Sequence, residues 1–483
     1  MSVRYRWTLA LAGSLGASLG ALTPLAAQRA ASRSSTGITI PFQKYELANG
    51  LTVVLAPDHA VPTVAVEVMY HVGSKNEVVG HTGFAHLFEH VMFTGSGHVP
   101  YGLHDKLTGG VGGDNNGSTD NDVTQYYETV PSNYLEDEIW LESDRMGWLL
   151  DALDTAKYNA QREIVKNERR QRVDNAPYGR ANEIIDAAIY PSGHPYSWPV
   201  VGSMTDLSNA SIEDVKAFFR LYYAPNNATL VITGDFDPAT ARAWVAKYFN
   251  GVPRGRPIVR PTAGPVTLAS EKRLVYEDRV QVPRLYIEWP TVGMSNPDQY
   301  ALSTLGDVLT GSRTARLTKA LVYDAQSAAN VSSGQGSNES VGEFVMTATP
   351  RPGHTLAEIE SAADSILRDI QQHGPTAAEL QRAKAGTKLG FLSQLQSNLG
   401  KAEELAVGQT FFNDPGHEFT TGYTAQQAVT AADVQRVARK YLGAGRVVLS
   451  VVPTGKTSLA SHPESSVNVT TSAGSSSNPT ENR

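Results

Sequence analysis

The segment His86-Leu87-Phe88-Glu89-His90 places two imidazoles and one carboxylate within five residues. The surrounding stretch 84–93 contains no Gly or Pro and is mostly apolar, which favours a helix. On a helix, residues four apart lie one above the other, so His86 and His90 could bind one cation while Glu89 shares their face. The same residues could instead form a solvated face with ordinary side-chain pairs.

A third ligand must come from another segment, because a catalytic zinc commonly has three protein ligands and one water. Residues 161–170 have helical periodicity, and Glu168 follows Ile164 by four residues and Val165 by three, which places its carboxylate toward the apolar face. A buried carboxylate needs a counter-charge, so Glu168 is predicted to bind the metal or to pair with an arginine. Gln161, on the same stripe, is predicted to hydrogen-bond a metal ligand.

The composition excludes several kinds of metal ligand and binding partner. The chain of 483 residues has no cysteine, so disulfides and thiolate ligands are excluded and any metal must be bound by His, Asp or Glu. The formal charge of −7 gives no basic field for phosphates, so nucleic acid is not an expected partner. His81 precedes the motif and could support a metal ligand, whereas His71, His98, His104 and His194 are predicted to be loop or packing residues.

The two ends of the chain differ in composition from the rest. Arg4 and Arg6 precede an apolar stretch at 7–22 that small residues follow, so residues 1–27 are predicted to be a signal peptide. No later stretch reaches the ~20 apolar residues of a membrane span, so we expect an exported protein of the bacterial periplasm with no span in the mature chain. Residues 457–483 are rich in Ser, Thr and Asn and are predicted to be a disordered tail.

One sequence unit occurs twice, at a spacing of roughly 220 residues. Residues 214–222, followed by an apolar run at 229–233, resemble residues 433–441, followed by an apolar run at 447–452. Two shorter matches have nearly the same spacing: Val61-Pro62 with Val282-Pro283, and Thr94-Gly95-Ser96 with Thr310-Gly311-Ser312.

The repeat predicts two homologous domains, residues 37–255 with the metal motif and residues 266–455 without it. A Pro-rich linker, 256–265, joins them. Runs rich in Val, Ile and Thr lie near both ends of a repeat, with helical periodicity between them. This order predicts an α+β fold in which each domain is a mainly antiparallel sheet covered by helices.

Together these features resemble the pitrilysin/insulinase family of zinc metallopeptidases, the inverzincins. The resemblance covers nearly the whole mature chain and is strongest to the two-domain bacterial branch, which is similar to mitochondrial processing peptidase subunits. It implies one Zn²⁺ per chain, bound by His86, His90 and by Glu168, whose distance from the motif matches the family's third ligand. It also implies that Glu89 is the general base on the zinc-bound water, in an endopeptidase acting on peptides or unfolded segments.

The segment 112–119 resembles the edge strand on which this family binds the backbone of a peptide substrate by strand addition. Asn116 and Gly117 occupy the matching positions, so the resemblance implies that they contact substrate. Gln161 stands where family members often carry Glu.

The second half departs from the family pattern. Leu302, Leu305 and Gly306 stand opposite the three motif residues, and the expected Arg/Tyr pair that grips substrate falls on Val322 and Ala329. A chain with the metal but without this pair resembles the catalytic member of a heterodimer, in which an inactive homologous subunit supplies the Arg and Tyr. A homodimer is the alternative.

Two other functions stay open at this stage. The chain could be a non-catalytic scaffold or binding subunit of the same fold, which the intact motif argues against. It could also be a zinc hydrolase acting on bonds other than peptides, which the resemblance of the substrate strand disfavours. Zinc analysis and chelator-sensitive peptide cleavage distinguish these alternatives.

Overall fold

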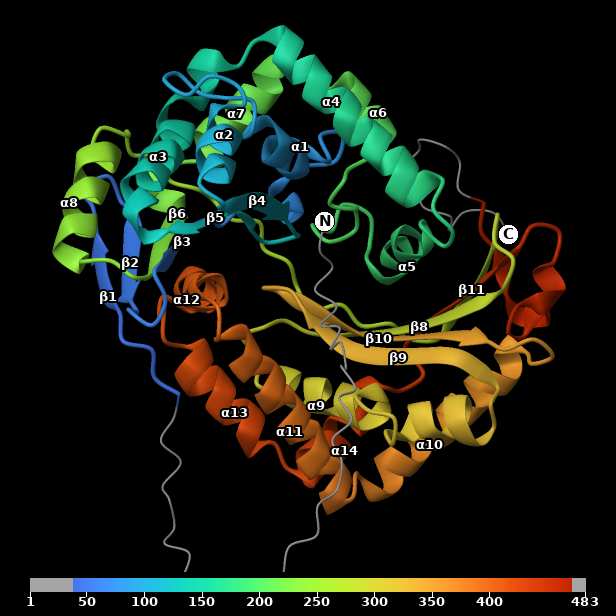
Figure 1. Ribbon diagram of the computed structural model, residues 1–483. Helices are drawn as coiled ribbons and strands as arrows, with labels where there is room; N and C mark the ends of the chain where they lie inside the picture. Colours follow the sequence, from blue (N-terminus) through green and yellow to red (C-terminus); the bar gives the residue numbers. More distant parts are fainter. Residues whose placement is uncertain (1–37, 471–483) are drawn as a thin grey trace, which may run out of the picture.

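The computed structural model describes residues 38–470 and contains two six-stranded sheets, each covered by helices (Figure 1). The predicted signal peptide and residues 471–483 lie outside the described part of the chain. The predicted α+β fold with two similar halves is confirmed. Among residues 38–470, no helix is long and apolar enough to cross a membrane.

The first sheet has the order β1-β2-β6-β3-β5-β4, and only the pair β2 and β6 is parallel. The second sheet has the order β12-β7-β11-β8-β10-β9, and β7 is parallel to both of its neighbours. The strands of the first sheet are β1 (Gln43–Glu46), β2 (Thr52–Pro57), β3 (Thr63–Tyr70), β4 (Asp114–Thr119), β5 (Thr124–Pro131) and β6 (Ala228–Gly234). Those of the second are β7 (Lys272–Asp278), β8 (Arg284–Val292), β9 (Ala328–Ser337), β10 (Val341–Pro350), β11 (Val447–Pro453) and β12 (Val467–Asn468).

The strand orders show the duplication directly, because β2-β6-β3-β5-β4 corresponds position by position to β7-β11-β8-β10-β9. The helices α7 (Ile212–Tyr222) and α14 (Ala431–Tyr441) precede the equivalent strands β6 and β11. Each begins with a capping box, in which a hydroxyl residue and the acidic residue three positions later bond each other's backbone N–H. The sequence match at 214–222 and 433–441 therefore marks equivalent helices.

Helices of the first half cover one face of the first sheet: α1 (Phe84–Val91), α2 (Leu103–Gly110), α3 (Leu135–Ala152), α4 (Thr155–Arg169), α6 (Met204–Asn209) and α8 (Pro238–Phe249) lie there with α7 (Figure 1). Side chains alternate across a strand, so Val53 and Leu55 of β2 enter this core while Val54 and Ala56 point to the opposite face. In the second half, α9 (Asp298–Thr310), α10 (Leu356–His373), α11 (Ala377–Gln394) and α13 (Tyr423–Ala428) lie with α14 below the second sheet.

One helix of each half packs on the sheet of the other half (Figure 1). Leu405 and Ala406 of α12 (Asn398–Phe412), from the second half, pack on Val54 and Met69 of the first sheet. In return, α5 (Ala181–Ile189), from the first half, packs its isoleucines on β11 of the second sheet. The two halves are thus joined by two apolar layers and not only by the linker.

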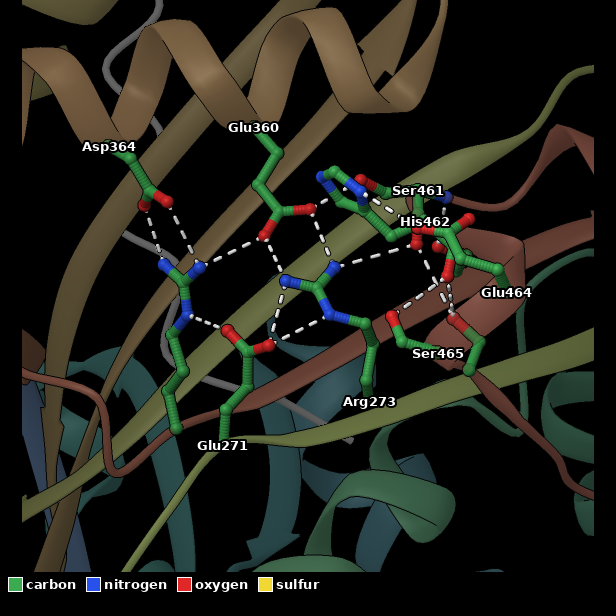
Figure 2. A network of polar contacts seen from close by, with 11 residues as sticks. Glu271, Arg273, Glu360, Asp364, Ser461, His462, Glu464 and Ser465 are labelled. Atoms are coloured by element: carbon green, nitrogen blue, oxygen red, sulfur yellow. Dashed lines mark hydrogen bonds and ion pairs between the residues drawn. The ribbon is translucent and has the colours of Figure 1, made fainter.

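The predicted start of the disordered tail at residue 457 is wrong, because residues 457–470 are folded. They form two short 3₁₀ turns and β12, which pairs with β7. Ser461 is fully buried: its hydroxyl donates to Glu360, and its backbone N–H donates to Ser450 Oγ at 3.0 Å. Glu360 in turn accepts from Arg273 at 2.6 Å and from Arg446 at 2.9 Å (Figure 2). Polar anchoring orders this segment, which a count of large apolar residues could not predict.

Candidate metal centre

The motif helix α1 is held at its start by a carboxylate from an earlier turn. Glu77 accepts the backbone N–H of Gly83 with Oε2 and that of Ala85 with Oε1, both at 2.8 Å. These donors are among those that a helix start leaves without partners, and Gly83 precedes the helix at φ 90°, a conformation that favours glycine. Burial raises the pKa of Glu77 to about 8, and the backbone N–H groups oppose this rise.

The apolar residues of α1 fix which way the motif faces. Phe84, Leu87, Phe88 and Val91 enter the core of the first half. The helix lies against α4 and β4, the elements that carry the other predicted site residues. His86 and Glu89 are buried, whereas the His90 side chain is 23% exposed and gives the site its opening to solvent.

The helix α4 is capped by Asp154, the residue before it, whose side chain accepts the backbone N–H of Lys157 at 2.8 Å. Its buried strip consists of Tyr158, Val165 and Arg169, so Val165 is fully buried as expected. The expectation for Ile164 is wrong: this side chain is 46% exposed, because α4 packs along a strip only about one residue wide. Glu168 lies beside that strip, with its side chain 14% exposed.

His86, His90 and Glu168 come together as the sequence predicts. One ligand atom from each lies within 4.8 Å of the others. Glu168 Oε2 is 3.1 Å from His90 Nε2 and 3.6 Å from His86 Nε2. A tetrahedral zinc with bonds of about 2.0–2.1 Å separates its ligand atoms by about 3.4 Å, so these three atoms fit the ion.

The protonation states also suit a metal. Burial, together with the neighbouring His90, lowers the pKa of His86 to about 3, so this imidazole is neutral at pH 7. Burial alone would raise the pKa of Glu168, but the hydrogen bond from His90 and the charges around it lower it to about 2. Metal ligands must be deprotonated, and these two are.

Glu168 also has the arginine partner that was the alternative prediction. Arg172, one turn later, forms an ion pair with Oε1, while Oε2 faces the imidazoles. The two predictions are therefore compatible, since each uses one carboxylate oxygen. Arg172 is 55% exposed and holds the carboxylate from its outer side.

Glu89 lies next to His90 and one turn from His86. Its Oε2 is buried and has no hydrogen-bond partner among the described residues. A buried carboxylate oxygen without a donor is costly unless something else bonds it. The arrangement thus leaves one acceptor free beside the three candidate ligands.

The predicted substrate residues lie on β4, the outer strand of the first sheet, which pairs only with β5 among the described strands. Asn116 is exposed, and its Oδ1 accepts the backbone N–H of Gly117 at 2.8 Å. A Cβ at Gly117 would lie 3.1 Å from the Tyr126 ring and 3.3 Å from Phe93, so the close packing favours glycine. Gln161 is half-buried on α4, two turns before Glu168, and its predicted hydrogen bond to a ligand stays a prediction.

In the second half, α9 occupies the place of α1. Its Leu302 and Leu305 are fully buried, and a Cβ at Gly306 would lie 3.0 Å from Gly334 Cα on β9. No group of metal-binding side chains occurs in the described residues of this half. Val322 packs at the edge of the core and Ala329 is exposed on β9, so neither can act as the Arg or Tyr of the family pattern.

Sequence reasoning missed Glu77. It lies nine residues before His86, in a stretch with no recognisable motif, and only the fold brings its carboxylate to the start of α1. A capping residue normally lies at the helix terminus itself, so local patterns could not find this one.

Comparison with known proteins agrees with this architecture. The family model described as "Insulinase (Peptidase family M16)" matches residues 52–193, and "Peptidase M16 inactive domain" matches residues 209–387. The chain is 30% identical over 363 residues to "Zinc protease PqqE" of Helicobacter pylori (strain ATCC 700392 / 26695), a match covering 73% of this chain and 80% of that protein. The chain therefore belongs to the insulinase family of zinc metallopeptidases, peptidase family M16.

Two further relatives extend the comparison. The chain is 23% identical over 415 residues to "Mitochondrial-processing peptidase subunit beta" of Lentinula edodes, covering 82% of this chain and 86% of that protein. The crystal structure of a protease from Helicobacter pylori superposes with a TM-score of 0.80 at 26% identity, covering 86% of this chain and all of that one. The match to the inactive domain begins at residue 209, after all four residues of the candidate centre.

Proposed function

We propose that this chain is a zinc-dependent endopeptidase with one catalytic Zn²⁺ bound by His86, His90 and Glu168. The observation that carries the proposal is the spacing of the three ligand atoms, 3.1 and 3.6 Å from Glu168 Oε2 to the two imidazoles, at a site open to solvent beside His90. The names of relatives such as the Helicobacter pylori zinc protease support the same class.

A zinc ion bound there would supply Lewis acidity, lowering the pKa of a water to about 7 and polarising a carbonyl. Glu89 takes a proton from the attacking water on its free Oε2 and delivers it to the leaving amine. Its burial keeps competing water away from this oxygen, and its place on α1 fixes its distance from His86 and His90. Arg172 holds Glu168 in the orientation that points Oε2 at the imidazoles.

The substrate is a peptide or an unfolded segment that adds as a strand to the free edge of β4. Main-chain hydrogen bonds to β4 give binding with little demand on side chains. Asn116 and Gly117 lie on this edge, next to α1. The lack of an Arg/Tyr pair at Val322 and Ala329 favours a second, inactive homologous subunit as partner, with a homodimer as the alternative.

The predicted signal peptide at residues 1–27 supports export, and we propose the bacterial periplasm as the site of action. A relative named as a processing peptidase subunit is consistent with assembly into a heteromer.

Two substitutions test the catalytic roles separately. Glu89→Gln is expected to retain zinc and to lose peptide cleavage by at least about 100-fold, as general-base removal does. His86→Ala is expected to lose the zinc bound at this site. Undiminished cleavage by Glu89→Gln contradicts the role of Glu89, and a wild-type chain that binds no zinc favours the scaffold alternative.

The partner is tested by assaying peptide cleavage with the chain alone and after co-expression with inactive homologues from the same cell. Activation only in the co-expressed sample is expected. Full activity of the purified chain alone contradicts an obligatory heterodimer.

A further inference from the structure

A second group of metal-binding side chains lies in the first half, apart from the residues of the candidate centre. His104 on α2, Glu128 on β5 and Glu142 on α3 each bring one ligand atom within 4.8 Å of the others. Glu128 and Glu142 are at most 1% exposed, and the His104 side chain is 12% exposed. Glu138 and Arg145, also on α3 and also buried, complete the cluster.

Three ligand-type atoms in this cluster have no hydrogen-bond partner among the described residues: His104 Nε2, Glu128 Oε2 and Glu142 Oε2. The first lies 3.3 Å from Glu128 Oε1 without forming a hydrogen bond. Buried carboxylate oxygens without donors are costly. Their position on three different elements indicates a ligand that bonds all three at once.

Arg145 does not satisfy these atoms. Its guanidinium pairs with Oε1 of Glu128 at 2.9 Å and with Oε1 of Glu142, so it uses one oxygen of each carboxylate and leaves Oε2 free. It also lies over the Tyr126 ring, 4.5 Å from the centroid, which fixes its own position. The arginine therefore orients the two carboxylates and leaves their other oxygens for a second cation.

The charges lead to the same conclusion. Glu128 and Glu142 are two buried carboxylates that share one permanently charged partner among the described residues, Arg145. Burial and the neighbouring Glu128 raise the pKa of Glu138 to about 8, so at neutral pH its proton removes one negative charge from the cluster. The other two carboxylates exceed the arginine by one buried negative charge, and a divalent cation on their free oxygens would compensate it.

We infer that His104, Glu128 and Glu142 form a second divalent-cation site, with a structural role. One imidazole nitrogen and two carboxylate oxygens form a mixed N/O ligand set, which suits Zn²⁺ or Mn²⁺. The bound ion ties α2 and α3 to β5 directly behind the substrate edge, since Glu128 pairs in register with Asn115 of β4. The site thus fixes the strand on which the proposed peptide would lie.

The test counts ions in a chain whose first site has been removed. His86→Ala/His90→Ala protein is stripped with chelator, loaded with Zn²⁺ or Mn²⁺, desalted, and analysed for metal by mass spectrometry, with folding checked by circular dichroism. We expect about one ion per chain in this variant and about two Zn²⁺ per wild-type chain. Addition of His104→Ala to the double variant should reduce its content to near zero.

His98→Ala in the same background is the matched control, because His98 also pairs with a buried acid of α3, Asp144, but lies outside the cluster. It should leave the ion count unchanged. A folded double variant that binds neither metal overturns the inference, whatever the wild-type chain binds. If only the first site fails, the wild-type chain and the double variant should bind the same number of ions per chain, about one each.

Discussion

The carboxylate of Glu77 offers a direct test of how the metal helix is positioned. It accepts two backbone N–H groups at the start of α1, each at 2.8 Å, and is 6% exposed. Glu77→Ala removes both acceptors. Glu77→Gln keeps one acceptor oxygen but turns an NH₂ group toward the second donor.

The magnitude follows from the number of donors left without an acceptor. A buried N–H that loses its partner costs about 1–3 kcal/mol, so Glu77→Gln should lower the free energy of unfolding by about that amount. Glu77→Ala leaves both backbone N–H groups without an acceptor and should lower the free energy of unfolding by about 2–6 kcal/mol, roughly twice as much. Because the loosened turn precedes His86, the alanine variant should also bind Zn²⁺ more weakly.

Urea unfolding followed by circular dichroism measures the first effect, and competition with a chelator measures the second. Glu163→Gln on α4 is the control, since this side chain is 51% exposed and its pair with Lys166 contributes little. The capping argument is refuted if Glu77→Ala is as stable as Glu163→Gln. A cost for alanine equal to that for glutamine would show that only one of the two bonds matters.

Three further predictions concern contacts between segments that are distant in the sequence. Burial raises the pKa of Glu339, but His71 and Lys75 outweigh it and hold the value at about 2. The stability that this carboxylate provides is therefore present above its ordinary pKa of about 4.3 and is lost as the pH falls toward 2. Wild type should be more stable than Glu339→Gln at neutral pH, and this difference in the free energy of unfolding should shrink by about 2–3 kcal/mol on acidification. Urea unfolding of both proteins measures it. Leu405→Ala, a fully buried change on α12, should cost about 2–5 kcal/mol in the same assay, and a loss below 1 kcal/mol would contradict tight packing of α12 on the first sheet. Glu360→Gln leaves two arginines partly unpaired and should cost about 3–5 kcal/mol, with earlier proteolysis of residues 457–470; an unchanged cleavage pattern would argue against anchoring by this network.

The parts that could be predicted from the sequence are those with a local or repeated signal. The helix at the motif 86–90 could be predicted because its apolar surroundings contain no Gly or Pro. On a helix, two histidines four residues apart lie on the same face. The repeated units at 214–222 and 433–441 carry their own capping residues, so their equivalence survives in the structure. Glu168 could be found because its spacing from the motif resembles a known family.

The parts that could not be predicted depend on contacts between distant segments. The periodicity around Ile164 indicated a broad apolar face, but only the packed structure shows that α4 buries a narrow strip. Ser461 looks like part of a polar tail until Glu360 and its arginines are placed beside it. His104 carries no motif at all, and its carboxylate neighbours come from two other elements.

The second half has no metal ligands among its described residues, but its helix α12 packs on the sheet of the half that has them. The face of the first sheet that carries Val54, Met69 and Val231 also carries the buried polar residues Glu67 and Thr229, and α12 of the second half covers it. Without that cover, the apolar residues of this face would be exposed to water, which soluble domains avoid where such residues adjoin. The strand β3 would then lose the support of α12, and β3 pairs with β5, which in turn pairs with β4. The second half thus acts on the candidate centre through packing, and its leucines at 302 and 305 serve its own core in place of the imidazole and carboxylate of the first half.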